Sequence, residues 1–394
     1  MANEQRAQAK KPPHLRPPPT IELARPPPGP HRSGFALLLG RPNVGKSTLL
    51  NALVGEHLAI VSPRPQTTRT RLLGIVNTPG TQLCLLDTPG VHRATDLLNR
   101  AMVQTALSAM SEVDVILYLA EAGWPSEAHR APGEAIDPVG PYHRELLADV
   151  ARSKKPVILV LTKVDLIPKP MLLPLMQAWS AAFPFREVYP LSALTGENMS
   201  EFVNVVRQFF PEGGPLFPPD SVTDQAERSL CAEFIREQVF LQTRDEIPYG
   251  VAVTIDDFDE SERPLPEESD EEVAPLLAAE PEAVEQDEED EEESADEEEP
   301  AKFEEPEERA PQRAKDRLGP GLVRIAASII VPRDSHKGIV IGKGGDRLKQ
   351  IGTASRHNIE RLLGCRVWLE MHVRVIPGWT EKKSMLAELG YSGA

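Results

Sequence analysis

The chain has 394 residues, with 43 Lys or Arg against 60 Asp or Glu, and its formal net charge at pH 7 is −17. This length predicts two or three domains, and no apolar run approaches the roughly 18 residues of a membrane-spanning helix, which argues against an integral membrane protein. Three cysteines without a Cys-x-x-Cys pair or a secretory signal favour a reducing compartment, of which the cytoplasm is the simplest.

The first segment, residues 1–33, is rich in proline and basic. It contains nine Pro and six Lys or Arg against two Glu. Such a composition predicts a disordered tail with some polyproline II character. An organellar transit peptide is the alternative, although transit peptides are usually richer in Ser and more amphipathic.

A glycine-rich phosphate loop follows at residues 40–47, with the pattern Gly-x-x-x-x-Gly-Lys-Ser. The loop lies between a strand-like apolar run at 35–39 and a helix-compatible stretch at 48–54. Backbone N–H groups of such a loop converge on phosphate oxygens, while Lys46 reaches the β and γ phosphates and Ser47 ligates Mg²⁺. The predicted nucleotide contacts here are Gly40, Arg41, Pro42, Asn43, Val44, Gly45, Lys46, Ser47 and Thr48.

Two later segments predict how the terminal phosphate and Mg²⁺ are held. The sequence Asp-Thr-Pro-Gly follows a strand-like run, so Asp87 can hold the Mg²⁺ shell and Gly90 can donate its N–H to the γ-phosphate. Residues 65–69 have no helical or strand period, as expected of a first switch loop whose threonine completes the Mg²⁺ coordination. Either Thr67 or Thr68 can be that threonine. The predicted metal ligands are Ser47, Asp87 and one of these two threonines.

Two further loops predict recognition of guanine. Thr-Lys-Val-Asp follows an apolar strand, and the Asp165 carboxylate can accept both N–H donors on the Watson–Crick edge of guanine, which adenine lacks. The second loop follows another strand and would offer the Ala193 N–H to guanine O6. The phosphate loop, the Asp-Thr-Pro-Gly segment and the two guanine loops occur in this order, and each follows a strand. We therefore interpret these four motifs as one GTP site. The predicted guanine contacts are Thr162, Lys163, Asp165, Ser192 and Ala193.

The Pro-Asn, Thr-Thr-Arg and Asp-Thr-Pro-Gly segments resemble those of the bacterial assembly-type GTPases. The resemblance favours Thr68 as the Mg²⁺ ligand and implies catalytic contacts from Lys46, Thr68 and Gly90. It also places the apolar Val91 where Ras-like switches have a water-orienting Gln. Members with an Asn in the phosphate loop can use K⁺, so Asn43 is a candidate K⁺ ligand. An Asn that only stabilises the turn of the loop is the alternative.

Most of the negative charge lies in one segment. Residues 256–310 hold 28 Asp or Glu and three Lys or Arg, which leaves 40 basic and 32 acidic residues elsewhere. An acidic, aromatic-poor segment cannot bury enough apolar surface to fold. We therefore expect a GTPase domain at 34–210, a Pro- and Gly-rich linker at 211–222, and a second domain at 223–394 that a disordered insertion interrupts at about 256–317.

The second domain has the element order of a type II KH fold. A helix at 224–243, two strands around the insertion, a helix, a Gly-x-x-Gly turn, a helix from Asp346 and a last strand at 366–375 follow one another. The turn lacks side chains that would keep a sugar-phosphate backbone away from a helix N-terminus. Residues 311–394 carry 15 Lys or Arg against seven Asp or Glu, which fits a groove for single-stranded RNA. The predicted RNA contacts are Lys337, Gly342, Lys343, Gly344, Gly345, Arg347 and Lys349.

An α/β P-loop GTPase domain with a doubly wound, mostly parallel sheet, followed by an α+β KH domain, resembles the Era family. Beyond the GTP motifs, the resemblance lies in Ile-Arg-Glu from Ile235, Ile-Pro-Tyr from Ile247 and Pro-Gly-Trp from Pro377. It implies GTP and GDP as ligands with Mg²⁺, binding of small-subunit ribosomal RNA, a role in small ribosomal subunit assembly, and peripheral association with the inner face of the cell membrane. No DNA binding is expected. Thr162 departs from the Asn that is usual in the family, so guanine affinity is expected to be lower.

Two other functions fit the same motifs. A signalling GTPase at the membrane or in the cell cycle would use the KH unit as a docking surface for a protein. A pure RNA-binding scaffold would lack GTP turnover. The acidic insertion also has two interpretations, either an intramolecular mimic of RNA beside the basic groove or a solvating linker.

Overall fold

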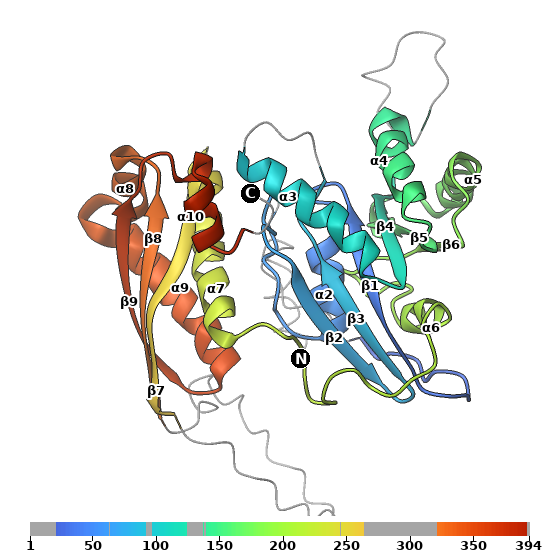
Figure 1. Cartoon of the computed structure of the whole chain (residues 1–394), viewed down its shortest axis with the longest axis horizontal. Helices are drawn as coiled ribbons and strands as arrows, with labels where there is room; N and C mark the ends of the chain where they lie inside the picture. The colour runs from blue at the N-terminus through green and yellow to red at the C-terminus, as the bar shows by residue number, and fades with distance from the viewer. Residues whose placement is uncertain are drawn as a thin grey trace, which may run out of the picture.

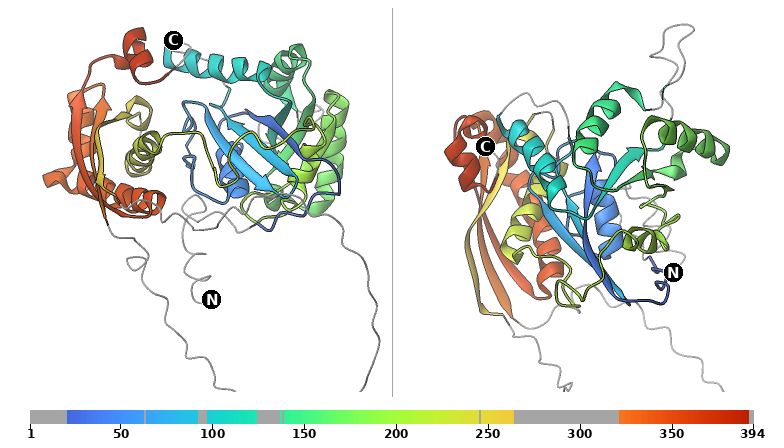
Figure 2. Two further views of the ribbon diagram at one scale, coloured as in Figure 1. Left: turned by 60° about the horizontal axis from the view of Figure 1, so that its bottom comes forward. Right: turned by 45° about the vertical axis from the view of Figure 1, so that its right-hand side comes forward.

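The structure, a computed structural model, describes residues 21–62, 64–91, 97–123, 137, 139–244, 246–263 and 321–391. Two domains lie side by side, and helix α7 (Glu227–Gln242) of the second domain faces the first (Figure 1). The two turned views of Figure 2 agree on this arrangement. No helix in the described part of the chain is long and apolar enough to cross a membrane.

The first domain contains a six-stranded sheet with the order β2-β3-β1-β4-β5-β6. All neighbouring strands are parallel except β2 and β3, which form an antiparallel pair. The sheet is therefore mostly parallel, as expected, although the sequence analysis did not predict β2 or β4. The strands are β1 (Arg32–Gly40), β2 (Leu72–Thr78), β3 (Thr81–Asp87), β4 (Val115–Glu121), β5 (Val157–Thr162) and β6 (Glu187–Pro190).

Helices cover both faces of this sheet. On β1, Ala36 and Leu38 pack on one face and Leu37 and Leu39 on the other, and all four are fully buried. Burial on both faces explains why β1 reads as a continuous apolar run. Helices α2 (Lys46–Val54) and α6 (Phe202–Arg207) pack on the first face, and α3 (Leu97–Ser108), α4 (Gly140–Arg152) and α5 (Leu172–Ala182) on the second. Four predicted motifs follow β1, β3, β5 and β6, so they meet at the carboxyl edge of the sheet, where doubly wound folds bind ligands.

The second domain has the order α7-β7-β8-α8-α9-β9, as predicted for a type II KH fold. Strands β7 and β8 are antiparallel, and β8 and β9 are parallel. Apolar side chains of α7 and α9, including Phe234, Ile235, Ile351 and Ile359, pack in one core with the strands. The remaining bounds are β7 (Ala252–Glu262), β8 (Leu322–Val331), α8 (Asp334–Ile341), α9 (Asp346–Leu363), β9 (Arg366–Val375) and α10 (Lys383–Glu388).

The predicted domain boundaries need two corrections in the first half of the chain. The disordered tail was expected to reach residue 33, but Ile21 and Leu23 already pack against the core beside α2. The predicted linker at 211–222 is fixed to the first domain, because the buried Gln82 side chain accepts N–H groups of Leu216 and Phe217 at 2.6 and 2.9 Å. Residues 1–20 lie outside the described part of the chain.

The acidic insertion begins later than the expected residue 256. Strand β7 continues to Glu262, where it pairs with Leu322 of β8, because the hairpin ladder satisfies the backbone of this acidic stretch. Leu322 in turn pairs with Arg366, just beyond the C-terminal end of α9. The Gly-x-x-Gly turn precedes the other end of α9, about 27 Å away for 18 helical residues. The strand ends that flank the insertion are thus remote from the predicted RNA groove, although the insertion was expected to lie beside that groove. Most of the insertion, residues 264–320, lies outside the described residues.

Candidate nucleotide-binding site

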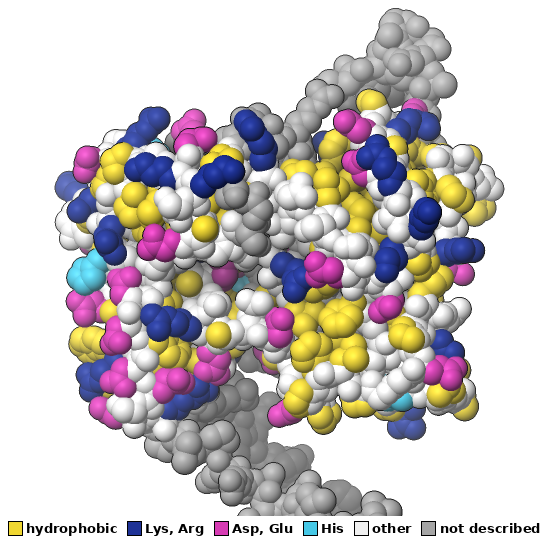
Figure 3. Space-filling view, viewed as in Figure 1, with side chains coloured by type: hydrophobic (Ala, Val, Ile, Leu, Met, Phe, Trp, Pro, Cys, Tyr) yellow, Lys and Arg dark blue, Asp and Glu magenta, His cyan; other side chains and the backbone are white. Residues whose placement is uncertain are grey.

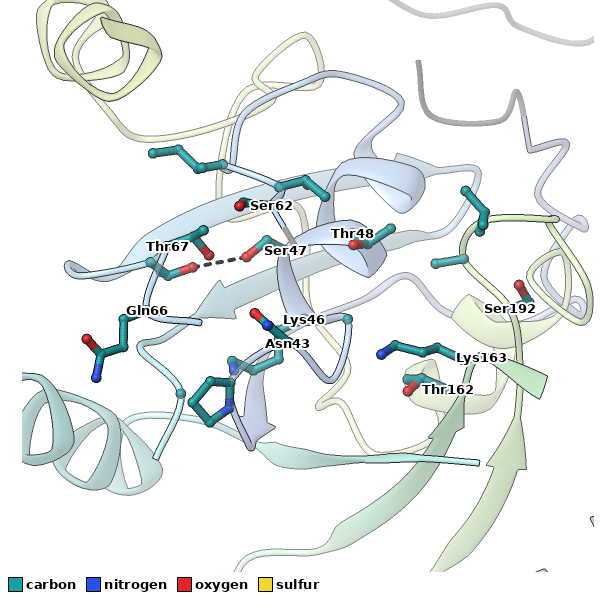
Figure 4. Close-up of a pocket in the computed structure, with 18 of the residues that line it drawn as sticks. Asn43, Lys46, Ser47, Thr48, Ser62, Gln66, Thr67, Thr162, Lys163 and Ser192 are labelled. Carbon is teal, nitrogen blue, oxygen red and sulfur yellow. Dashed lines mark hydrogen bonds between the residues drawn. The ribbon is translucent and has the colours of Figure 1, made fainter. Parts of the chain in front are cut away.

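A cavity of about 520 Å³ lies at the carboxyl edge of the first sheet (Figure 4). Most of the predicted nucleotide contacts line it, namely Pro42, Asn43, Gly45, Lys46, Ser47, Thr48, Thr68, Gly90, Thr162, Lys163, Asp165, Ser192 and Ala193. Gly40, Arg41, Val44 and Asp87 lie in the adjoining segments without lining it. The sequence analysis did not single out Ile60, Val61, Ser62, Leu166 and Leu194, which also line the cavity. Loop residues of this kind, four of them apolar and one a serine, carry no motif that identifies them in a single sequence.

The phosphate loop leads directly into α2, so its backbone N–H groups gather at a helix N-terminus. Lys46 is the first residue of α2 and is buried, and its Nζ lies 3.4 and 3.1 Å from the carbonyl oxygens of Gly40 and Arg41. Burial lowers the pKa of Lys46, and the nearby Asp87 carboxylate opposes this shift. A phosphate group in the cavity would favour the charged ammonium further.

Three side chains with oxygen atoms contact one another beside the phosphate loop. The Ser47 hydroxyl lies 2.7 Å from Asp87 Oδ2 and 3.0 Å from the Thr68 hydroxyl, a contact drawn as the dashed line in Figure 4, and Thr68 lies 3.1 Å from the same carboxylate oxygen. Asp87 is fully buried, and its Oδ1 has no hydrogen-bond partner among the described residues. Burial raises the pKa of Asp87 and outweighs the opposing effects of Lys46, Ser47 and Thr68. This donor set fits a hard cation such as Mg²⁺.

The geometry distinguishes the two candidate threonines of the switch loop. The Thr68 hydroxyl contacts Ser47 and Asp87, whereas no hydrogen bond links the Thr67 side chain to them within the described part of the chain. The Thr67 carbonyl instead accepts a hydrogen bond from Arg236 of the second domain. The arrangement favours Thr68, in agreement with the resemblance to the assembly-type GTPases.

The segment after Asp87 lies against the phosphate loop. A Cβ on Gly90 would stand 2.6 Å from the Pro42 nitrogen, so only glycine allows this approach. The Thr88 hydroxyl donates to the Leu38 carbonyl at 3.1 Å, and the Val91 N–H donates to the Gly40 carbonyl at 3.2 Å. Gly90 therefore lies against the phosphate loop at the edge of the cavity, and its role as a donor to the terminal phosphate stays a prediction.

The opposite end of the cavity is formed by the two predicted guanine loops. Asp165 is exposed and lines the cavity. The buried Thr162 hydroxyl lies 2.7 Å from the Val44 carbonyl and 3.2 Å from the Ala120 carbonyl, so it ties this loop to the phosphate loop. Lys163 adopts a left-handed backbone with φ of 59° and pairs with Glu121 at 2.8 Å. Thr162 thus links the guanine loop to the phosphate loop although it stands where the family usually has Asn.

Asn43 also has left-handed backbone geometry, with φ of 61°. Asn tolerates this conformation better than most residues, which accounts for an Asn at the turn of the loop. Its side chain lines the cavity beside Lys46 (Figure 4). The backbone thus supports the turn-stabilising interpretation, and the K⁺ site stays a prediction.

The switch loop that carries Thr68 is attached to the second domain on both sides of that residue. Arg69 is 4% exposed and donates to three backbone carbonyls of the second domain, Val251 at 2.6 Å, Pro248 at 2.9 Å and Tyr249 at 2.8 Å. On the other side, Arg64 Nη1 donates to the carbonyls of Phe240, at 2.9 Å, and Thr243. The motifs Ile-Arg-Glu and Ile-Pro-Tyr therefore belong to the interface that holds the switch loop.

A second group of contacts joins α7 to the loop after α2. The buried Glu237 carboxylate accepts from His57 Nε2 at 3.0 Å and from the Val61 N–H at 3.3 Å. The His57 ring stacks on Phe234, with centroids 5.5 Å apart. Burial lowers the pKa of His57, but the hydrogen bond and charge of Glu237 outweigh burial, so the pKa is raised overall. None of these interdomain partners was predicted, because partners about 180 residues apart leave no local signal.

The predicted RNA contacts gather around the start of α9. Gly344 has φ of 63°, and a Cβ there would meet nothing within 4 Å, so the turn presents bare backbone to solvent. Lys343 and Lys349 are exposed, and Ile339 is 41% exposed beside them. Arg347 Nη1 donates to the Ile339 carbonyl at 2.6 Å and so also holds the turn. On the face in Figure 3, Lys and Arg side chains gather over the end of this domain that carries α8 and α10.

The first domain has a phosphate loop and two predicted guanine loops at one edge of a doubly wound sheet. The second domain has the element order of a KH fold. These features together define a P-loop GTPase with a KH domain. In residues 35–163 the chain matches the family described as 50S ribosome-binding GTPase, and in residues 311–380 it matches the KH domain family. The GTPase Era of Geobacter metallireducens is 42% identical over 363 residues, 92% of this chain and 99% of that protein. That of Lacticaseibacillus paracasei is 35% identical, covering 92% and 97% of the two chains.

Solved structures agree with these relatives. An Aquifex aeolicus Era variant bound to GDP and AlF₄⁻ has a TM-score of 0.70 and 32% identity, and Era in complex with MgGDPNP and nucleotides 1506–1542 of 16S ribosomal RNA has a TM-score of 0.71 and 32% identity. Each comparison covers 92% of this chain and 99% of the other. The chain therefore belongs to the Era family of GTPases, and it hydrolyses GTP.

Proposed function

We propose that this GTPase is a switch that binds small-subunit ribosomal RNA through its KH domain and assists assembly of the small ribosomal subunit. The observation that carries the proposal is the attachment of the Thr68 segment to the KH domain through Arg64, Arg69 and Arg236. A nucleotide that orders or releases this segment changes the contact with the RNA-binding domain. Such a connection is what a switch requires.

The small subunit is the favoured partner because of the relative that matches both domains. That relative was solved with a 16S ribosomal RNA segment, and it covers 92% of this chain. The family description that names the 50S subunit applies to residues 35–163 alone, which exclude the KH domain. The relative that matches both domains therefore supports the small subunit as the partner.

The residues at the phosphate end fit the predicted roles. Ser47, Thr68 and Asp87 would hold Mg²⁺, which when bound supplies positive charge against the β and γ phosphate oxygens. Lys46 would add a second positive charge at the same phosphates. Gly90 would donate its N–H to the γ-phosphate, since its backbone already touches the phosphate loop. At the other end, Asp165 would read guanine.

A pair of glycine variants tests RNA binding through the KH turn. Gly344→Asp places a carboxylate where a phosphate would approach, and we expect affinity for an RNA of the 16S 3′ region to fall about tenfold, while GTP hydrolysis without RNA stays at the wild-type rate. Gly364→Asp is the matched control, because its φ of 68° and open surroundings equal those of Gly344 but it caps the far end of α9.

Filter binding or fluorescence anisotropy at constant salt provides the measurement, because the electrostatic part of the affinity depends on salt. Wild-type RNA affinity in Gly344→Asp would place the RNA surface elsewhere. An equal loss in both variants would indicate a general effect of added negative charge. Peripheral membrane association stays a prediction.

A further inference from the structure

Tyr142, near the start of α4, lies between the phosphate loop and the segment that follows Asp87. Its hydroxyl donates to the Val91 carbonyl at 2.5 Å. Its ring receives the Arg41 guanidinium, which stands 4.9 Å from the ring centroid. One side chain from outside every GTP motif therefore contacts both the loop that holds the phosphates and the segment that senses them.

The contact with Val91 fixes the backbone next to Gly90. The Val91 N–H donates to the Gly40 carbonyl at 3.2 Å, and its carbonyl accepts from Tyr142, so both polar groups of this residue are held. The preceding Gly90 lines the nucleotide cavity. A shift of the Val91 carbonyl would rotate the backbone on which the Gly90 N–H depends, and misplacement by about 1 Å at a reacting group costs large factors in rate.

The surroundings of Tyr142 keep its hydroxyl a donor. Burial raises the pKa of Tyr142 to about 12, so the phenol stays protonated at neutral pH. The neighbouring His143 contacts the ring edge-on at 5.3 Å between centroids. Burial, followed by the charge of Arg41, lowers the pKa of His143 to about 4, so no second cation forms there at neutral pH.

Val91 itself explains why such a residue is needed. Its apolar side chain can neither orient water nor bind phosphate, so any polar contact of Val91 comes from its backbone. We propose that Tyr142 is a positioning residue for GTP hydrolysis, whose hydroxyl holds the Val91 carbonyl and so keeps the Gly90 N–H directed at the terminal phosphate. The proposal rests on the role of Gly90 given above and on the GTPase activity of the family.

Tyr142→Phe in the full chain separates the hydroxyl from the ring, because Phe keeps the contact with Arg41. We expect kcat for GTP to fall about tenfold while KM changes less than about twofold. Affinity for Mg-GDP with aluminium fluoride, which mimics the transition state, should fall by a similar factor, and affinity for Mg-GDP alone should not change. A merely structural role would lower both affinities together.

Tyr118→Phe is the control, because it removes a buried phenol hydroxyl of the same cluster that bonds His143 at 2.7 Å, whereas the Val91 carbonyl is bonded by Tyr142. It should hydrolyse GTP at the wild-type rate. Wild-type kcat in Tyr142→Phe, or parallel losses of kcat, GDP affinity and thermal stability, would overturn the proposal. Neither tyrosine variant alters the KH turn, so both should bind RNA with wild-type affinity. The Gly344→Asp test of RNA binding can therefore fail without affecting the test of Tyr142.

Discussion

The two ends of the nucleotide cavity are built differently. At the guanine end, Thr162, Asp165 and Ala193 stand on loops that are held by hydrogen bonds within the first domain. At the phosphate end, Thr68 stands on a loop held by Arg64 and Arg69 against backbone of the KH domain. The predicted base contacts therefore depend on one domain, whereas the predicted contacts with the terminal phosphate and its metal depend on two.

This difference separates two tasks. A site that identifies guanine must work identically with GDP and GTP, so it gains nothing from a second domain. A site that distinguishes GTP from GDP must transmit the presence of one phosphate, and a loop shared with the RNA-binding domain transmits it directly. Variants at the two ends should therefore have distinct consequences.

The largest expected effect follows from removing the shared arginine. Arg69→Ala removes the donor from three backbone carbonyls in contacts that are buried or partly buried, and we expect about 3 kcal/mol of destabilisation, measured by urea denaturation of the full chain. Arg71→Ala is the control, since Arg71 is exposed and pairs with Glu112 of its own domain. Equal stability of the two variants would contradict an essential role for the interdomain contact.

The next effect concerns the guanine end. Asp165→Asn removes the acceptor for the guanine N–H groups, so GTP affinity should fall by about 1.5–3 kcal/mol and xanthosine triphosphate should become preferred. Stability and RNA affinity should not change, because Asp165 has no contact with the KH domain among the described residues. An unchanged base preference in competition binding would remove this role from Asp165.

A smaller effect distinguishes the two interpretations of Asn43. If Asn43 is a K⁺ ligand, hydrolysis should be several-fold faster in K⁺ than in Na⁺ at equal ionic strength, and Asn43→Ala should abolish the difference. Asn43→Gly is the matched control for the turn, because glycine accepts a φ of 61° as readily. Equal wild-type rates in both salts would contradict the K⁺ site and leave stabilisation of the turn as the role of Asn43.

The pH dependence of interdomain contact should reflect His57. Because the folded-state pKa of His57 is raised above 6.5, its contribution to stability is complete below that value and is lost as pH rises through the folded-state pKa. Glu237 on α7 favours the charged imidazole, Arg361 on α9 disfavours it, and the Phe234 ring stacks on it. His57→Gln should remove the stability difference between pH 6 and pH 8 that the wild type shows, measured by thermal denaturation. A persisting difference would assign it to another group.

The smallest effect concerns Thr162. One hydroxyl hydrogen serves the Val44 and Ala120 carbonyls, whereas the two N–H groups of an Asn would serve both. Thr162→Asn should therefore raise GTP and GDP affinity equally, by less than about 1 kcal/mol each. A change confined to GTP would show that this loop also senses the terminal phosphate.

The sequence placed the residues of the guanine end at the cavity, whereas it did not predict what holds the phosphate end. Asp165 and Ala193 line the cavity because they lie in local motifs, at strand ends that apolar runs reveal, and their guanine contacts stay predictions. Arg69 and Glu237 act on partners about 180 residues away, so only the folded chain shows what they contact. Tyr142 lies in no motif and makes no interdomain contact among the described residues. The sequence could not predict its bond to the Val91 carbonyl, because any tyrosine in an amphipathic helix looks the same.

The fold shows a similar division. The buried strands β1 and β5 were predicted because they are apolar on both faces, and β9 was predicted with its observed bounds, Arg366–Val375. The end of β7 was misplaced because its acidic residues resemble the insertion that follows, and only pairing with β8 identifies them as strand. Composition thus located the insertion but not its boundary.

We infer that the KH domain helps to build the phosphate end of the site, because Arg69 holds the loop of Thr68 against it. Titration calorimetry with MgGDPNP and MgGDP, on the wild type and Arg69→Ala, tests it most directly, and Arg69→Lys serves as a milder variant that keeps the charge. We predict that Arg69→Ala loses about tenfold in affinity for MgGDPNP and less than about twofold for MgGDP, because only the triphosphate requires Thr68 in place. Equal losses for both nucleotides, or no loss for either, would contradict the claim.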